Sequence, residues 1–252
     1  AAAIFYSEEA VADGEDSTPL LAHEIAHQWY GNTVTEADWP HLWLSEGVAT
    51  YLTGLYLEHA DGIERLRQYM ADARTSVARF HEQNPETPLV DTTFSDPNEL
   101  LTANPYQKGA WVLHMLRYEV GTDTFWEGMR AYYERYRNEN ASTADFRRVM
   151  EDVSGQNLQS FFNQWTRRAG HPVIEGTWAY DAAAETCTIS LRQTQEAAPF
   201  SVPVQVAVGD AVTTIDLQGR TGEAQVECAG EPDSVTIDPQ TRLLGEFSMT
   251  RE

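Results

Sequence analysis

The stretch Leu20-Leu21-Ala22-His23-Glu24-Ile25-Ala26-His27-Gln28-Trp29 decides how the rest of the chain is interpreted. His23 and His27 are four residues apart, so on an α-helix their directions differ by only about 40° and they are separated by about 6 Å along the axis. Both imidazoles can therefore bind the same metal ion. Glu24 lies about a quarter-turn from His23, where it can reach a water molecule without binding the metal. This H-E-x-x-H arrangement predicts two zinc ligands and a general base.

A third zinc ligand is predicted at Glu46, because a catalytic zinc ion has three protein ligands and one open position for water. Eighteen residues separate His27 from Glu46, which is enough for a helix end near Gly31 and a second helix that returns beside the first. We therefore expect His23, His27 and Glu46 to bind one Zn²⁺ per chain.

The residues around the two histidines are apolar, which predicts a buried helix over 17–30. Two buried histidines need partners or a metal ion to offset their desolvation. The apolar positions are Leu20, Leu21, Ile25, Ala26, Trp29 and Tyr30.

The composition excludes several classes of partner. The 252 residues include 39 acidic and 17 basic side chains, which gives a net charge of −22 and argues against nucleic acid as a partner. No apolar run approaches the ~20 residues of a membrane helix, so we expect a soluble protein without a membrane partner.

Lys108 is the single lysine. Arginine in place of lysine is typical of a salty cytoplasm or a GC-rich genome, and the compartment stays open. We expect Lys108 to pair with a nearby acid and assign it no catalytic role.

Helical periodicity dominates the first two thirds of the chain, and strand periodicity dominates the last third. A short strand is expected at 4–7, and Ser17 is expected to cap the helix that follows. Further helices are expected at about 38–57, 61–83, 106–119, 122–136, 143–153 and 158–168, with a proline-containing loop at 84–98. Period-two alternation predicts strands at 186–191, 202–208, 212–217 and 234–238 of an antiparallel sandwich. Cys187 and Cys228 fit either a disulfide across that sandwich or two free thiols.

Three segments in the same order resemble the M1 family of zinc aminopeptidases, which includes leukotriene A4 hydrolase. They are His23-Glu-Ile-Ala-His-Gln-Trp-Tyr-Gly-Asn32, Leu42-Trp-Leu-Ser-Glu-Gly-Val-Ala49 and Asn104-Pro-Tyr-Gln-Lys-Gly-Ala110. The resemblance implies an α+β multidomain protein: a mainly α, thermolysin-like zinc peptidase domain over 1–170 and a small antiparallel β-sandwich over 171–252. It also implies that the hydroxyl of Tyr106 stabilises the oxyanion formed during hydrolysis.

The expected chemistry is zinc-dependent hydrolysis of peptide bonds. The metal lowers the pKa of a water molecule, and Glu24 accepts its proton. The resemblance implies removal of amino-terminal residues from peptide substrates.

One departure from the family limits this expectation. M1 aminopeptidases have a G-x-M-E-N segment before the zinc helix, and its glutamate holds the substrate's α-amine, but no such segment lies between Ala1 and His23. The start Ala1-Ala2-Ala3-Ile4 suggests a piece of a longer protein, whose amino-terminal domain would be a partner. We therefore expect weak aminopeptidase activity, or none, from this chain by itself.

Two alternatives remain. A thermolysin-like endopeptidase would cleave blocked peptides, whereas an amine-anchoring enzyme would refuse them. A non-catalytic interaction domain would hold zinc structurally, but structural sites are usually closed by four protein ligands.

The excess of acidic residues leads to a first prediction, which concerns salt. We interpret these residues as a solvated surface, and like charges on one surface repel each other unless they are screened. Raising NaCl from about 0.1 M to about 1 M, where the Debye length falls from about 10 Å to about 3 Å, should raise the melting temperature. An unchanged melting temperature in a calorimetric salt series would contradict this expectation.

Overall fold

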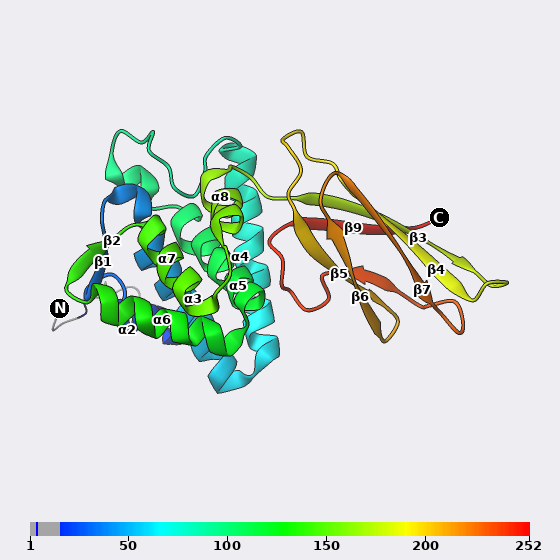
Figure 1. Ribbon diagram of the computed structural model, residues 1–252, viewed down its shortest axis with the longest axis horizontal. Helices are drawn as coiled ribbons and strands as arrows, with labels where there is room; N and C mark the ends of the chain where they lie inside the picture. Colours follow the sequence, from blue (N-terminus) through cyan, green and yellow to red (C-terminus); the bar gives the residue numbers. More distant parts are fainter. Residues whose placement is uncertain (1–3, 5–15) are drawn as a thin grey trace. The chain divides into compact units, whose positions relative to one another are not determined.

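The structure, a computed structural model, describes Ile4 and residues 16–252, which form two compact units (Figure 1). The first unit is Ala1–Gly170 and the second is His171–Glu252. The strand expected at 4–7 falls, apart from Ile4, outside the described residues. None of the described helices is long and apolar enough to cross a bilayer.

The first unit is mainly helical, with one small parallel sheet. Strands β1 and β2 of that sheet pair Val34 with Glu139 and Glu36 with Ala141. The elements in chain order are α2 (Thr18–Ala26), β1 (Val34–Glu36), the 3-10 turn η1 (Trp39–His41), α3 (Trp43–Asp61), α4 (Ile63–Gln83), the 3-10 turn η2 (Pro97–Leu100), the π-helical turn η3 (Asn104–Lys108), α5 (Gly109–Val120), α6 (Thr122–Tyr136), β2 (Glu139–Ala141), α7 (Thr143–Ser154) and α8 (Gln159–Arg167).

Helix α2 is shorter than the sequence indicated and is capped by a different residue. Ser17 makes no side-chain cap; the Asp16 carboxylate accepts a hydrogen bond from the Thr18 amide at 3.0 Å instead. The helix ends at Ala26 rather than near Tyr30, because the following amides of Gln28 and Trp29 bond to carbonyls three residues back. This tightening is common at helix ends, and it turns the chain toward β1.

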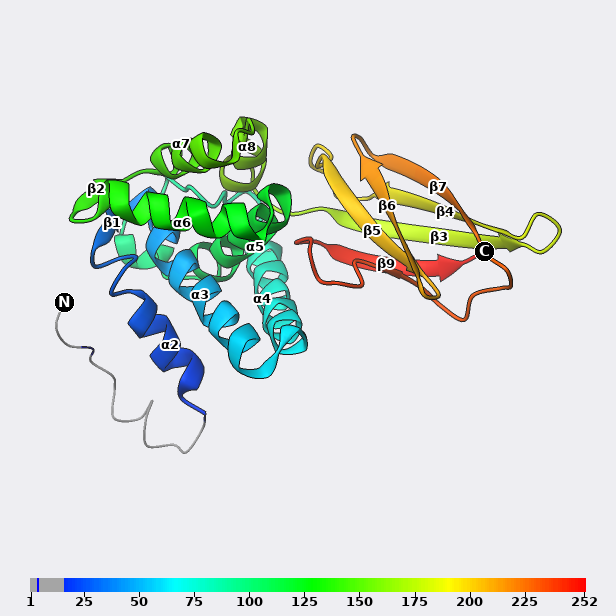
Figure 2. The same cartoon turned by 60° about the horizontal axis from the view of Figure 1, so that its bottom comes forward.

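The expectation that this helix is buried was wrong for one of its sides. Figure 2 shows α2 at the edge of the helical unit, beside α3. Leu21 is 40% exposed, and Ile25 and Trp29 are each 49% exposed, whereas Ala26 is buried. Apolar residues occur on both sides of this helix, so hydrophobicity alone did not identify the side that packs against α3.

Helix α3 carries Glu46 through the centre of the unit. It begins at Trp43 rather than near residue 38, because Trp39, Pro40 and His41 form a 3-10 turn first. Twelve of its 19 residues are buried, so the helix has no solvated face along much of its length. The position of Glu46 is therefore set by core packing on several sides.

A close contact between two glycines fixes α3 against the start of α5. A Cβ atom on Gly47 would lie 2.8 Å from the Cα atom of Gly109 and 2.9 Å from the carbonyl oxygen of Pro105. A Cβ atom on Gly109 would lie 2.9 Å from the Cα atom of Gly47. The two backbones thus approach more closely than any larger residue allows. This contact brings the turn η3 next to the residue that follows Glu46.

The second unit contains two sheets. One has the strand order β7-β4-β3-β9, and the other has the order β6-β5-β8. The sheets contact each other, since a Cβ atom on Gly222 in β7 would meet Leu217 and Ile215 of β6. The strands are β3 (Val173–Asp181), β4 (Thr186–Gln193), β5 (Val202–Val208), β6 (Ala211–Leu217), β7 (Thr221–Glu227), β8 (Val235–Ile237) and β9 (Glu246–Arg251).

The expected antiparallel pairing holds for all pairs in these two sheets except one. Strand β9 runs parallel to β3, with Val173 opposite Glu246 and Trp178 opposite Arg251. Period-two alternation reveals which residues face the core but says nothing about strand direction. Of the two alternatives for the cysteines, the structure has free thiols, with Cys187 buried on β4.

The glycine contact leads to a second prediction. Replacing Gly47 with alanine should lower the free energy of unfolding by about 1–3 kcal/mol, because the new methyl group meets backbone atoms that cannot rotate away. Gly128→Ala is the matched control: it also lies in a helix, but its methyl group would meet only the flexible end of Met150. Urea denaturation followed by tryptophan fluorescence measures both. Equal losses for the two variants would show that the α3–α5 approach is not tight.

Candidate metal centre

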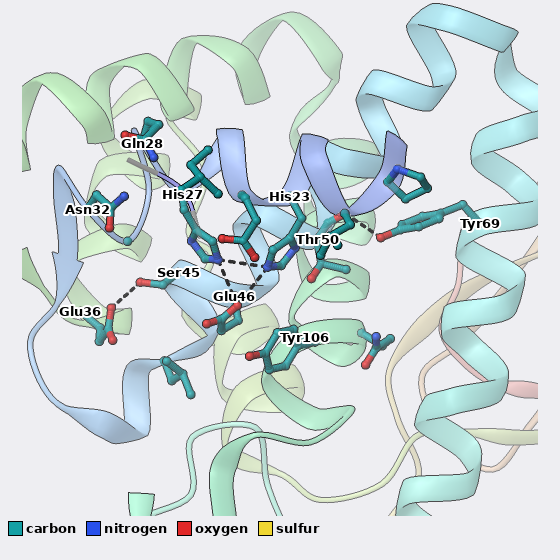
Figure 3. Close-up of a pocket in the computed structure, with 17 residues that line it drawn as sticks. His23, His27, Gln28, Asn32, Glu36, Ser45, Glu46, Thr50, Tyr69 and Tyr106 are labelled. Carbon is teal, nitrogen blue, oxygen red and sulfur yellow. Dashed lines mark hydrogen bonds and ion pairs between the residues drawn. The ribbon is translucent and has the colours of Figure 1, made fainter. Parts of the chain in front are cut away.

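Three side chains from two helices meet at one point (Figure 3). His23 and His27 come from the last turn and the end of α2, and Glu46 comes from the first turn of α3. The two Nε2 atoms are 3.0 Å apart, and each lies 3.2 Å from Oε2 of Glu46. Among the described residues, this is the one group of three or more His, Cys, Asp or Glu side chains arranged so that it could hold a metal ion.

The spacing of these three atoms fits zinc. Ligand atoms about 2.0–2.2 Å from a tetrahedral Zn²⁺ lie roughly 3.3–3.6 Å from one another, which follows from the tetrahedral angle. The observed separations of 3.0–3.2 Å are close to this range. Two imidazole nitrogens and one carboxylate oxygen are also the donor set of zinc peptidases. The structure thus brings together the three residues that the sequence indicated, in an arrangement that needs little adjustment to bind the ion.

The electrostatics of the site favour a positive charge between these atoms. Burial alone would raise the pKa of Glu46, but hydrogen bonds and charge interactions with His23 and His27 outweigh it and lower the pKa to about 2. For His27, burial alone would lower the pKa, but the Glu46 carboxylate outweighs burial and raises it. Both shifts favour a positive charge next to the Glu46 carboxylate.

The chain around His27 also fixes the orientation of its ring. Nδ1 of His27 lies 3.0 Å from the backbone oxygen of Tyr30, so this nitrogen donates to the carbonyl and Nε2 carries the free lone pair. Gly31 follows with φ of 115°, a left-handed conformation. A Cβ atom on Gly31 would lie 2.8 Å from Nδ1 of His27. The glycine therefore allows the turn that presents the Tyr30 carbonyl to the histidine.

The three side chains lie in a cavity of about 790 Å³ that also contains Glu24 and Tyr106. The exposed fractions of the His23, His27 and Glu46 side chains are 16–17%, so the centre is accessible from the cavity but mostly shielded from water. Besides Glu24 and Glu46, the cavity contains the acid Glu36, whereas no lysine or arginine is among the described residues that line it. The cavity is thus suited to a cationic group of a ligand.

Tyr106 faces the metal centre from the turn η3. Its ring lies nearly parallel to that of His23, with 14° between the planes and 6.0 Å between the centroids. Burial, followed by the charge of Glu46, raises the pKa of the Tyr106 hydroxyl above its usual value. The hydroxyl therefore stays protonated at neutral pH and can donate a hydrogen bond.

Several residues in the cavity were not singled out from the sequence. The Ser45 hydroxyl donates a hydrogen bond to Glu36 of β1, and the Tyr69 hydroxyl of α4 donates to the backbone oxygen of Thr50 at 3.2 Å. The first contact links β1 to the residue just before Glu46. The two contacts join residues 9 and 19 positions apart in the chain, and no periodic pattern indicates such pairs.

Comparison with known proteins agrees with this geometry. Residues 3–165 match the model of the peptidase family M1 domain. Aminopeptidase M1-C of Oryza sativa subsp. japonica is 33% identical over 187 residues, which are 73% of this chain and 21% of that protein. Glutamyl aminopeptidase of Homo sapiens is 30% identical over 170 residues, which are 66% of this chain and 18% of that protein. The chain spans about a fifth of the length of these curated relatives.

A solved structure shows the same fold. The crystal structure of Legionella pneumophila aminopeptidase A in complex with aspartic acid matches 91% of this chain and 26% of that chain. The TM-score is 0.77, and the sequence identity is 20%. This likeness supports the α+β architecture, and the family model covers well over half of the residues. The chain belongs to peptidase family M1.

Proposed function

We propose that this chain hydrolyses peptide bonds with a zinc ion held by His23, His27 and Glu46, and that it acts at the free amino end of peptides. The observation that carries the proposal is the convergence of three zinc-type donor atoms within 3.0–3.2 Å of one another, in a cavity that also contains a glutamate and a protonated tyrosine. The name aminopeptidase, shared by the relatives, supports the choice of reaction.

The bound zinc ion would supply Lewis-acid polarisation of a carbonyl group and a lowered pKa for water. Glu24 would accept the proton of the water molecule that attacks the scissile carbonyl carbon. The Tyr106 hydroxyl would donate a hydrogen bond to the carbonyl oxygen as negative charge develops on it. The hydrogen bond between His27 and the Tyr30 carbonyl would keep the histidine in the correct tautomer.

The charges in the cavity favour a substrate with a free amine. With Glu46 bound to the zinc ion, Glu24 and Glu36 are the remaining acids that line the cavity, and no lysine or arginine is among the described lining residues, so a protonated amine is attracted. The endopeptidase alternative lacks such support, because an internal peptide bond carries no charge. We still expect slow turnover, since the sequence contains no G-x-M-E-N segment to hold the amine.

A third prediction separates catalysis from metal binding. Glu24→Gln should lower kcat by about 10²–10⁴-fold while zinc stays at one ion per chain, because Glu24 moves a proton and does not bind the metal. His27→Ala is the matched control and should lose both zinc and turnover. Metal analysis together with steady-state kinetics on short peptides measures both quantities. Full activity in Glu24→Gln would exclude Glu24 as the base. Stoichiometric zinc in the unsubstituted chain without turnover on any peptide would favour a non-catalytic role for the chain.

A fourth prediction concerns the amino end of the substrate. A peptide with a free α-amine should have a higher kcat/KM than its acetylated form by about tenfold, because acetylation removes the positive charge that the Glu24 and Glu36 carboxylates attract. A longer chain that supplies a G-x-M-E-N segment should widen this ratio. Equal cleavage of the free and acetylated peptides would support the endopeptidase alternative.

A further inference from the structure

Lys108 is a buried cationic residue that the proposed chemistry does not use. It is the single lysine of the chain, and its exposed fraction is 0%. Burial lowers the pKa of Lys108 to about 7. A lysine in such a place is costly, because its amine must give up either its charge or its hydration.

The partner of Lys108 is a histidine, not the acid that the sequence led us to expect. Nζ of Lys108 lies 3.2 Å from Nε2 of His81, which is on α4 and is also buried. Nδ1 of His81 lies 3.4 Å from the backbone oxygen of Asn84, so this nitrogen faces an acceptor and Nε2 is left to accept from the lysine. Lys108 can thus donate a hydrogen bond to a neutral imidazole instead of a carboxylate.

The position of Lys108 in the chain connects this pair to Tyr106. Both residues belong to the π-helical turn η3, and π-helical turns occur often at functional sites. Two residues apart in a helical turn, the side chains point to roughly opposite sides. Tyr106 lines the metal cavity, while Lys108 is buried in the interior.

Other contacts fix the two ends of η3. The Asn104 side chain donates to the Pro88 oxygen at 2.7 Å, which fixes the first residue of the turn. The Gly47–Gly109 contact fixes Gly109, the residue that follows the turn. Between these two points, the bond from Lys108 to His81 is a side-chain hydrogen bond that ties the turn to α4.

We propose that Lys108 is a positioning residue for Tyr106, and that its hydrogen bond to His81 sets the rotation of η3 at which the tyrosine hydroxyl faces the reacting carbonyl. This inference rests on the proposed function, because the role of Tyr106 is assigned there. Filling space would not require a lysine, since an apolar side chain of similar length would occupy the same volume without desolvation. Replacing a buried polar pair with apolar residues is often neutral or stabilising.

The test therefore separates stability from catalysis in the zinc-loaded chain. Lys108→Met combined with His81→Leu, which replaces both polar partners with apolar side chains, should keep or raise the melting temperature and keep the zinc content. It should lower kcat by about tenfold or more with KM changed less than about twofold, because Tyr106 acts in the transition state and small misplacements are costly. His81→Gln alone, which keeps an acceptor for the lysine, should retain most of the activity.

A double variant shows whether Lys108 acts through Tyr106. Tyr106→Phe removes the hydroxyl, so adding Lys108→Met to it should lower kcat no further. Additive losses would overturn the proposal. So would an unchanged kcat, or a parallel loss of melting temperature and activity, in the variant that carries both Lys108→Met and His81→Leu.

A spectroscopic readout is independent of turnover. The ¹⁹F resonance of 3-fluorotyrosine incorporated at position 106 should shift in Lys108→Met, and an unchanged resonance would overturn the inference. A zinc-loaded chain that cleaves no peptide, yet shows this shift, would overturn the proposed function while supporting the positioning of Tyr106 by Lys108.

Discussion

Three electron-donor atoms that lie 3.0–3.2 Å apart inside a protein repel one another unless a proton or a cation lies between them. His23, His27 and Glu46 are in this situation, and the pKa of Glu46 is lowered while that of His27 is raised, which is the direction expected where positive charge is favoured. The scaffold must therefore hold the three atoms together against their repulsion. Much of the first unit can be understood as the means of doing so.

The scaffold holds these groups in place through close approach of backbone segments at glycine residues. Glycine at positions 47 and 109 lets α3 touch the start of α5, so the metal ligand on α3 and the tyrosine on η3 share one rigid contact. Gly31 plays a comparable part on the other side, where its left-handed backbone lets the Tyr30 carbonyl orient His27. In both places, the absence of a Cβ atom determines how the reactive groups are arranged.

The sequence predicted what depends on local spacing. The H-E-x-x-H pattern and the downstream glutamate identified three residues that the structure brings together, and helical periodicity located α4, α6 and α7 to within a few residues. Features that depend on tertiary contacts were missed. The exposed side of α2 was expected to be buried, since apolar residues occur all around that helix. The parallel pairing of β3 with β9 joins residues more than 70 positions apart, and alternation carries no information about strand direction.

Lys108 shows the same limit at a single side chain. A single lysine in an acidic chain suggests a carboxylate partner, and charge counting offers no reason to choose a histidine. The structure places the lysine where a carboxylate would add a second desolvation cost, and a neutral acceptor such as Nε2 of His81 avoids it. A buried polar pair of this kind adds little to the free energy of unfolding, because the cost of desolvating the two groups offsets their attraction. Its value lies in direction, because a hydrogen bond fixes the angle of a turn more sharply than apolar packing does.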